Sequence, residues 1–72
     1  MSGYVVVIEG DEDDGFSAWS PDLPGCVAAA SGYEECVMLM REAIAVHLDV
    51  MREHGDTIPA PSAAGAFTVV AA

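Results

Sequence analysis

The chain contains no lysine, and its only strongly basic side chains are those of Arg41 and Arg52. Because it also carries 12 acidic side chains, its formal net charge at pH 7 is −10. Proteins that bind DNA or RNA use Lys and Arg to displace counterions from phosphate groups, and anionic membrane surfaces attract the same side chains. The composition therefore argues against nucleic-acid and membrane partners, and it is compatible with a basic protein partner or a basic ligand.

Cysteine is scarce as well, and only Cys26 and Cys36 are present. Two cysteines are too few for a disulfide scaffold or a thiolate zinc site, and both lie among apolar neighbours, where cysteine behaves as a small hydrophobe. No apolar run approaches the roughly 20 residues that span a bilayer, and the N-terminus lacks a signal-peptide pattern. We therefore expect a reduced, cytoplasmic protein that has no metal and no cofactor.

The chain is short, with 72 residues, yet 53% of them are hydrophobic. This composition excludes a disordered acidic tail, and the length is close to the lower limit for a domain that folds alone. We expect a single domain over residues 1–72.

Three short strands are predicted in the first 30 residues. The β-branched run from Tyr4 to Glu9 is followed by a Gly-flanked acidic turn and by a second strand from Phe16 to Ser20, which together indicate a β-hairpin. In the second strand, Phe16 and Ala18 share one face, and Ser17 and Trp19 share the other. Pro21 ends the ladder, Pro24-Gly25 favours a type II turn, and Cys26 to Ala30 forms the third strand.

A long helix is predicted from Gly32 or Tyr33 to about His54, with Gly55 as the C-cap residue. Its buried face follows a 3-4 spacing through Tyr33, Val37, Met40, Ile44, Leu48 and Met51. A second apolar strip consists of Leu39, Ala43, Val46 and Val50. The two strips cover more of the helix than one sheet can bury, so we expect a partner chain on the second strip and a homo-oligomer, either a dimer or a tetramer.

After the helix, a linker rich in Pro and Ala is followed by a predicted fourth strand from Ala66 to Val70. The element order is then β-β-β-α-β. Connection rules place the fourth strand in the same sheet. The predicted fold class is α+β, with a single four-stranded sheet and one long helix packed on it.

The densest charge is the acidic run Asp11, Glu12, Asp13 and Asp14 in the hairpin turn. A calcium loop would need alternating carboxylates and a later bidentate Glu, and a two-metal site would need carboxylates from separate elements. The run lacks both features. It is typical of a solvated hairpin tip, with electrostatic contact to a basic partner as the functional alternative.

No catalytic constellation is recognisable in the sequence. His47 and His54 are two helical turns apart, about 10 Å, which is too far for one metal ion. A thiol nucleophile would need a lowered pKa, which strong negative charge opposes. The serines lack a nucleophile-elbow context, and no glycine-rich phosphate loop is present. We therefore expect a protein that is not an enzyme.

The succession of motifs resembles the HicB family of type II antitoxins. The first motif, after the hairpin, is Pro21-Asp22-Leu23-Pro24-Gly25-Cys26. The predicted helix then contains Glu34-Glu35 and Arg41-Glu42-Ala43-Ile44. Ile58-Pro59 and Pro61-Ser62 follow the helix in the sequence. The resemblance spans about Tyr4 to Ser62. It implies a partial ribonuclease H-like fold without the nuclease carboxylates. Many family members carry a C-terminal DNA-binding domain, and we expect no such domain in this chain.

The resemblance also implies a function, because HicB proteins bind and block HicA, a small basic toxin that cleaves mRNA. A very acidic chain suits this task as a mimic of phosphate on the RNA-binding surface of the toxin. The candidate toxin contacts are Asp11, Glu12, Asp13, Asp14, Trp19, Pro21, Asp22, Leu23 and Pro24. The alternative is a stand-alone oligomeric module that binds a protein or a small ligand and has no toxin partner.

Overall fold

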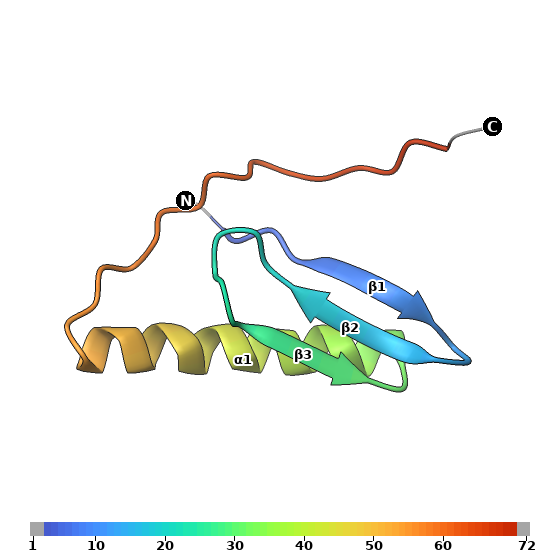
Figure 1. Ribbon diagram of the computed structural model, residues 1–72, viewed down its shortest axis with the longest axis horizontal. Coiled ribbons are helices and arrows are strands. Elements are labelled where there is room, and N and C mark those ends of the chain that lie inside the picture. The colour runs from blue at the N-terminus through green and yellow to red at the C-terminus, as the bar shows by residue number, and fades with distance from the viewer. Residues whose placement is uncertain (1–2, 71–72) are drawn as a thin grey trace.

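The computed structural model describes residues 3–70, which form one three-stranded antiparallel sheet and one helix. The elements follow one another as β1 (Val7–Asp11), β2 (Gly15–Trp19), β3 (Val27–Ala30) and α1 (Tyr33–Glu53). The strands lie in the order β1-β2-β3, so β1 and β3 are the two edges. The helix covers one face of the sheet, and the opposite face is open (Figure 1). The predicted α+β class is confirmed.

The β1–β2 hairpin pairs Val7 with Trp19 at its open end and Asp11 with Gly15 at its tip. β1 begins three residues later than the sequence predicts. The tip needs glycine at position 10, where φ is +119° and an added Cβ would lie 2.0 Å from the carbonyl oxygen of Gly15. Only a residue without a side chain fits such a close approach of two backbones.

The connection from β2 to β3 makes two backbone turns. The amide of Leu23 donates to the carbonyl of Ser20 at 3.3 Å, and the amide of Cys26 donates to that of Leu23 at 3.1 Å. Gly25 takes the positive φ of +83° that the predicted type II turn requires. The turns bring the side chain of Leu23 into the core, where it is 1% exposed.

The helix α1 begins and ends close to the predicted residues. Gly32 is its N-cap and offers no side-chain hydrogen bond, while Glu34 and Glu35 lie in the first turn at the positive end of the helix dipole. At the other end Gly55 has φ +72°, and the amide of Asp56 donates to the carbonyl of Met51 at 2.9 Å. This geometry is a Schellman motif with His54 as the C-cap and Gly55 as the left-handed residue after it, so the predicted end of the helix is confirmed.

The core lies between α1 and the covered face of the sheet. Its buried apolar members are Ala18, Leu23, Cys26, Cys36 and Met40. The predicted helical face is confirmed for Met40, whereas Tyr33 is 52% exposed and packs edge-on against the ring of Phe16. Both cysteines are free and buried, and burial raises the pKa of the Cys26 thiol. They are the small apolar core residues that the sequence predicts.

The predicted fourth strand is not formed, so the sheet has three strands in place of the predicted four. Residues 66–70 are extended but pair with no strand in the described part of the chain, and Phe67 is 90% exposed. A β-branched sequence favours a strand only where a neighbouring strand and a packing surface are available. The linker instead attaches to the body near its start, where the Tyr4 hydroxyl donates to the carbonyl of Pro59.

Candidate functional site

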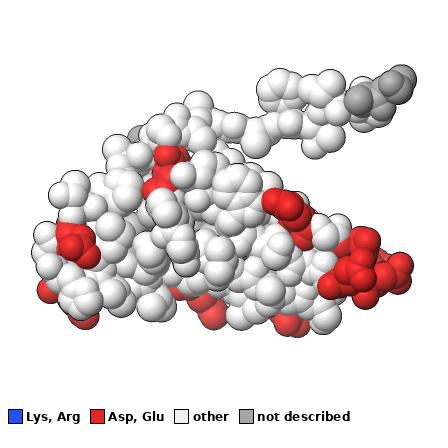
Figure 2. Space-filling model, in the orientation of Figure 1, with Lys and Arg blue, Asp and Glu red and all other residues white. Residues whose placement is uncertain are grey.

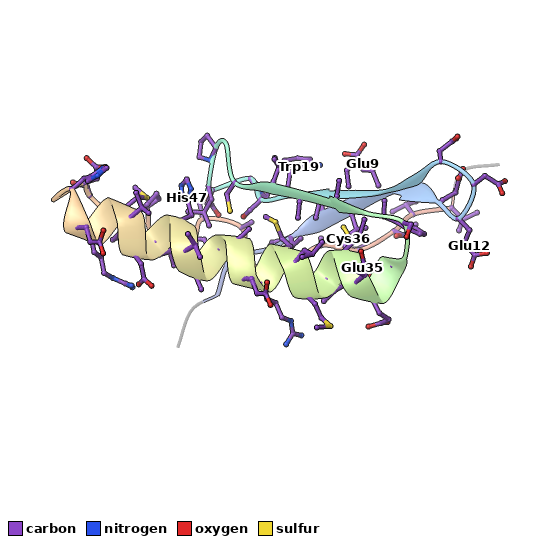
Figure 3. The ribbon with its side chains drawn as sticks, turned by 90° about the horizontal axis from the view of Figure 1, so that it is seen from below. Glu9, Glu12, Trp19, Glu35, Cys36 and His47 are labelled. Atoms are coloured by element: carbon purple, nitrogen blue, oxygen red, sulfur yellow. The ribbon has the colours of Figure 1, made fainter. Side chains whose placement is uncertain are left out.

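The face of the sheet turned away from α1 presents a mixed apolar and polar surface. Alternation along the strands sends Val7, Glu9, Ser17, Trp19, Val27 and Ala29 to this side, which we call the open face. Trp19 is 41% exposed and Val27 is 64% exposed. Figure 3 shows Trp19 and Glu9 pointing away from the helix, while Cys36 lies between the helix and the sheet. The predicted separation of Trp19 from the core face is confirmed.

Trp19 is held in place by a neighbour on the adjacent strand. Its indole Nε1–H donates to the Glu9 carboxylate at 2.6 Å, across the β1–β2 pair. A hydrogen bond to an ionised acceptor is stronger than one between neutral groups, so the exposed ring has a defined orientation. Large rigid aromatic side chains are favoured at the centres of protein interfaces, where they bury much surface at a small cost in entropy. The sequence indicated Trp19 as a candidate contact residue, but it did not indicate that Glu9 holds the indole ring in place.

The acidic tip, residues Asp11 to Asp14, lies at one end of the open face. All four side chains are exposed, and the Asp11 Oδ1 accepts hydrogen bonds from the amides of Asp13 and Asp14 at 2.9 and 2.8 Å. Figure 2 views the open face, and acidic atoms gather at this end while no atom of a described Lys or Arg is visible. Residues 3–70 contain no group of three metal-binding side chains that could hold an ion. The tip is therefore a patch of negative charge.

The Pro21–Pro24 loop borders the other end of β2. Pro21 and Pro24 are exposed, whereas the buried side chain of Leu23 belongs to the core and offers no contact surface. Asp22 accepts hydrogen bonds from the hydroxyl and the amide of Ser62 and from the amide of Ala63. These bonds hold the pKa of the Asp22 carboxyl below its ordinary value. Asp22 thus attaches the linker to the body at Ser62 and Ala63, a role that its sequence position did not indicate.

The second helical strip lies beside β3 and away from the open face. Leu39, Val46 and Val50 are 37%, 62% and 43% exposed, and Ala43 is half-buried. With Val27 and His47 they line a groove of about 470 Å³ between α1 and the end of β3. The strip is therefore uncovered within one chain.

Apart from the buried Leu23, the predicted site residues thus fall on two surfaces. Trp19 lies on the open face between the acidic tip and the Pro21–Pro24 loop, and the helical strip forms a separate surface beyond β3. Val27 joins the two, since its side chain is on the open face and also lines the groove. No helix within residues 3–70 is long and apolar enough to cross a bilayer.

Comparison with known proteins gives consistent matches over most of the chain. A UPF0150 protein of Thermoplasma acidophilum, Ta0767, is 32% identical over 60 residues, which cover 83% of this chain and 87% of that protein. A UPF0150 protein of Archaeoglobus fulgidus is 36% identical over 53 residues, covering 74% of this chain and 77% of that protein. An uncharacterised 14.9 kDa protein of Haemophilus phage HP1 is 34% identical over 56 residues, and the match spans 41% of its length.

No solved structure matches the chain. The family model of the HicB-like antitoxin of bacterial toxin–antitoxin systems matches residues 4–69, which include the hairpin, the Pro-rich loop, the helix and the C-terminal segment. A match of this extent, together with relatives above 30% identity that align with most of the chain, shows that the protein belongs to the HicB-like antitoxin family.

Proposed function

We propose that this chain is an antitoxin that binds a basic, HicA-type mRNA-cleaving toxin and covers its RNA-binding surface. Membership in the family supports an antitoxin-like, non-catalytic role with a toxin as partner. The observation that carries the finer proposal is the open face, where Trp19, fixed by Glu9, lies next to the acidic tip. The face combines an aromatic anchor with charge of the sign that a basic nuclease attracts.

The charge decides which kind of partner is favoured. At −10 the chain repels phosphate groups, so it competes with RNA for the toxin and does not bind RNA itself. The acidic tip takes the place of backbone phosphates, and Pro21, Asp22 and Pro24 border the contact. Such an inhibitor acts in the cytoplasm, where the mRNA is, and needs no cofactor.

We also infer that the helical strip is covered by a second copy of the chain. Three exposed aliphatic side chains beside a groove of about 470 Å³ form a contiguous apolar surface of the kind that interfaces use. This contact would reach the open face only at Val27 and would leave Trp19 and the acidic tip free, so self-association and toxin binding would not compete.

Surface plasmon resonance against a purified HicA-type toxin tests the proposal. Binding is expected for the unmodified chain, and an excess of it is expected to abolish RNA cleavage by the toxin. The Trp19→Ala variant is expected to dissociate from the toxin at least tenfold faster than the unmodified chain, because buried aromatic anchors act mainly on the dissociation rate. Met38→Ala, which truncates an even more exposed apolar side chain on the helix, is the matched control and is expected to bind normally.

If the unmodified chain does not bind the toxin, the proposed antitoxin function is wrong. The alternative would then be a stand-alone oligomeric module that binds a protein or ligand. The groove between β3 and α1 favours this alternative, since it is apolar and has His47 at its border. Equal dissociation rates for Trp19→Ala and Met38→Ala would instead move the toxin contact away from the open face.

A further inference from the structure

The open face is hollowed beside the acidic tip. Strand register places Glu9, Ser17 and Ala29 in one row across the sheet, next to the row that contains Trp19. Beyond this row lies a hollow of about 410 Å³, which we call the tip hollow. It is lined by Glu9, Asp14, Ser17 and Ala29, together with the adjoining glycines of the hairpin. Because serine, alanine and glycine are small, the sheet leaves room here for a side chain from another molecule.

Two carboxylates border the tip hollow, and hydrogen bonds order the chain around both. The Oε1 atom of Glu9 accepts the indole hydrogen bond of Trp19 at 2.6 Å, whereas its Oε2 atom accepts no hydrogen bond from residues 3–70. The amide of Asp14 donates to Asp11 at 2.8 Å, which holds the turn that carries the Asp14 carboxylate. Figure 3 shows Glu9 beside Trp19, on the side of the sheet away from the helix. The tip hollow thus offers acceptors that the described residues leave unused.

The described part of the chain supplies no cation to these carboxylates. Arg52 forms an ion pair with Asp49 on the helix at 3.1 Å, and Arg41 lines a groove between the helix and the covered face of the sheet. Figure 2, which views the open face, shows acidic atoms at the tip and no arginine. Residues 3–70 also contain no group of side chains that could hold a metal ion. A bound cation therefore has to come from another molecule, and a second copy with a net charge of −10 is a poor source of it.

We propose that the tip hollow binds one arginine side chain of a basic protein partner, and that Glu9 determines the specificity of this contact. The methylene stem of the arginine lies against the Trp19 ring, and its guanidinium donates to Oε2 of Glu9 and to the carboxylate of Asp14. The indole bond already orients Glu9 and Trp19, so the contact forms without first ordering either side chain. The identity of the partner as a toxin rests on the proposed function, whereas the recognition of arginine depends on this chain alone.

The surroundings of the tip hollow favour arginine over lysine. A guanidinium group carries its donors in a planar fork, so it can donate to two carboxylates at once. A lysine ammonium group is a strongly hydrated point charge, and it loses more hydration on entering a hollow that is lined by Ala29 and adjoins an indole ring. Arginine and tryptophan are also the residues that most often dominate the energy of an interface. The contact therefore discriminates between the two kinds of cation and does not depend on the sign of the charge alone.

The first test uses two tripeptides of equal charge, acetyl-Gly-Arg-Gly-amide and acetyl-Gly-Lys-Gly-amide. Trp19 is the only tryptophan, so its indole N–H gives a single NMR resonance that reports on this site. The arginine peptide is expected to shift this resonance and the amide resonances of Ser17 and Ala29 along a saturable curve at millimolar concentration. The lysine peptide is expected to bind at least about threefold more weakly. Equal affinities for the two peptides, or no shift at these three residues, would overturn the proposal.

Two variants locate the peptide in the tip hollow. Glu9→Gln removes the charge but keeps a side-chain oxygen for the Trp19 indole, and Ala29→Gln fills the hollow from β3 without changing that bond. Both positions are exposed, so both variants are expected to keep the circular dichroism of the unmodified chain and to lose the preference for arginine. Glu53→Gln and Ala45→Gln make the same changes at exposed positions on the helix and are the matched controls. A preference for arginine that persists in Glu9→Gln would contradict the proposal.

The second test measures the same variants against a HicA-type toxin by surface plasmon resonance. Glu9→Gln is expected to raise the dissociation rate about tenfold, because removing one partner of a hydrogen-bonded charge pair acts on dissociation. Glu53→Gln is expected to leave the dissociation rate unchanged. Equal rates for the two variants would overturn the proposal, while binding of the toxin would still uphold the proposed function. Selective binding of the arginine peptide without any binding of the toxin would support the tip hollow as an arginine site and refute the proposed toxin partner.

Discussion

Asp22 is the residue on which the course of the C-terminal segment depends. It accepts hydrogen bonds from Ser62 and Ala63, and it joins two parts of the chain that are 40 residues apart in sequence. Because its carboxylate is exposed, the bonds position the linker more than they stabilise the fold.

Acid is expected to release this attachment. The hydrogen bonds from Ser62, and then that from Ala63, lower the folded-state pKa of Asp22 from its ordinary 3.8. The stabilisation is therefore complete at pH values above 3.8 and is lost as the pH falls through the lower, folded-state pKa. The amide resonances of Ser62 and Ala63, followed by NMR, are expected to shift and broaden in that range. Asp22→Asn is the control, and it is expected to show no such titration; a titration that persists in this variant contradicts the assignment.

Met40 is the deepest large helical side chain, and its truncation tests the core. Met40→Ala is expected to lower the free energy of unfolding by about 2–5 kcal/mol, since it leaves a cavity between α1 and the sheet. Met38 lies two residues before Met40 and is 62% exposed, so Met38→Ala is expected to change the free energy of unfolding by no more than about 0.5 kcal/mol. Urea denaturation followed by circular dichroism measures both. Equal losses would mean that the helix packs with a different face.

At the scale of the elements, the helix could be predicted nearly to the residue, because its 3-4 spacing, its acidic first turn and Gly55 all agree. The hairpin and the turn at Pro24-Gly25 were equally predictable, since they depend on local chemistry. Cys36 was predicted to be a small apolar residue but was not assigned to the buried face of the helix, because a small thiol gives a weak periodic signal. The open face followed from alternation, whereas its Trp19–Glu9 bond depends on strand register, which the turn alone did not fix.

The pairing of the fourth strand could not be predicted from the sequence. Composition predicts that residues 66–70 prefer an extended, paired state, but it carries no information on which edge, or which copy, supplies the partner. The role of Ser62 is equally non-local, since it depends on a carboxylate at position 22.

The helical strip leads to a prediction about assembly. Val46→Glu places a charge in the middle of the strip and is expected to lower the mass of the assembly by half, because an unpaired charge is costly to bury. Ala45→Glu adds the same charge on the exposed polar side of α1 and is the matched control. Light scattering at micromolar concentration measures both variants, and an unchanged mass for Val46→Glu would exclude the strip as an interface.

For the whole molecule, the proposed toxin complex is expected to form by charge steering. Replacing the acidic tip with Asn and Gln should slow association several-fold, because charges at the rim act mainly on the association rate. The dependence of that rate on ionic strength should also become weaker, since salt screens long-range attraction. Surface plasmon resonance at several salt concentrations measures both effects. The same rate for the neutralised and the unmodified tip would show that steering comes from other carboxylates.

The two attachments of the linker, Tyr4 to Pro59 and Asp22 to Ser62, also bear on where a protease can cut the chain. Residues 64–70 lie beyond the last attachment and are all exposed. Exposed terminal segments are the preferred sites of proteolytic cleavage. A protease that cuts after aromatic residues is therefore expected to cleave at Phe67 before it cleaves at Phe16, which is half-buried in β2.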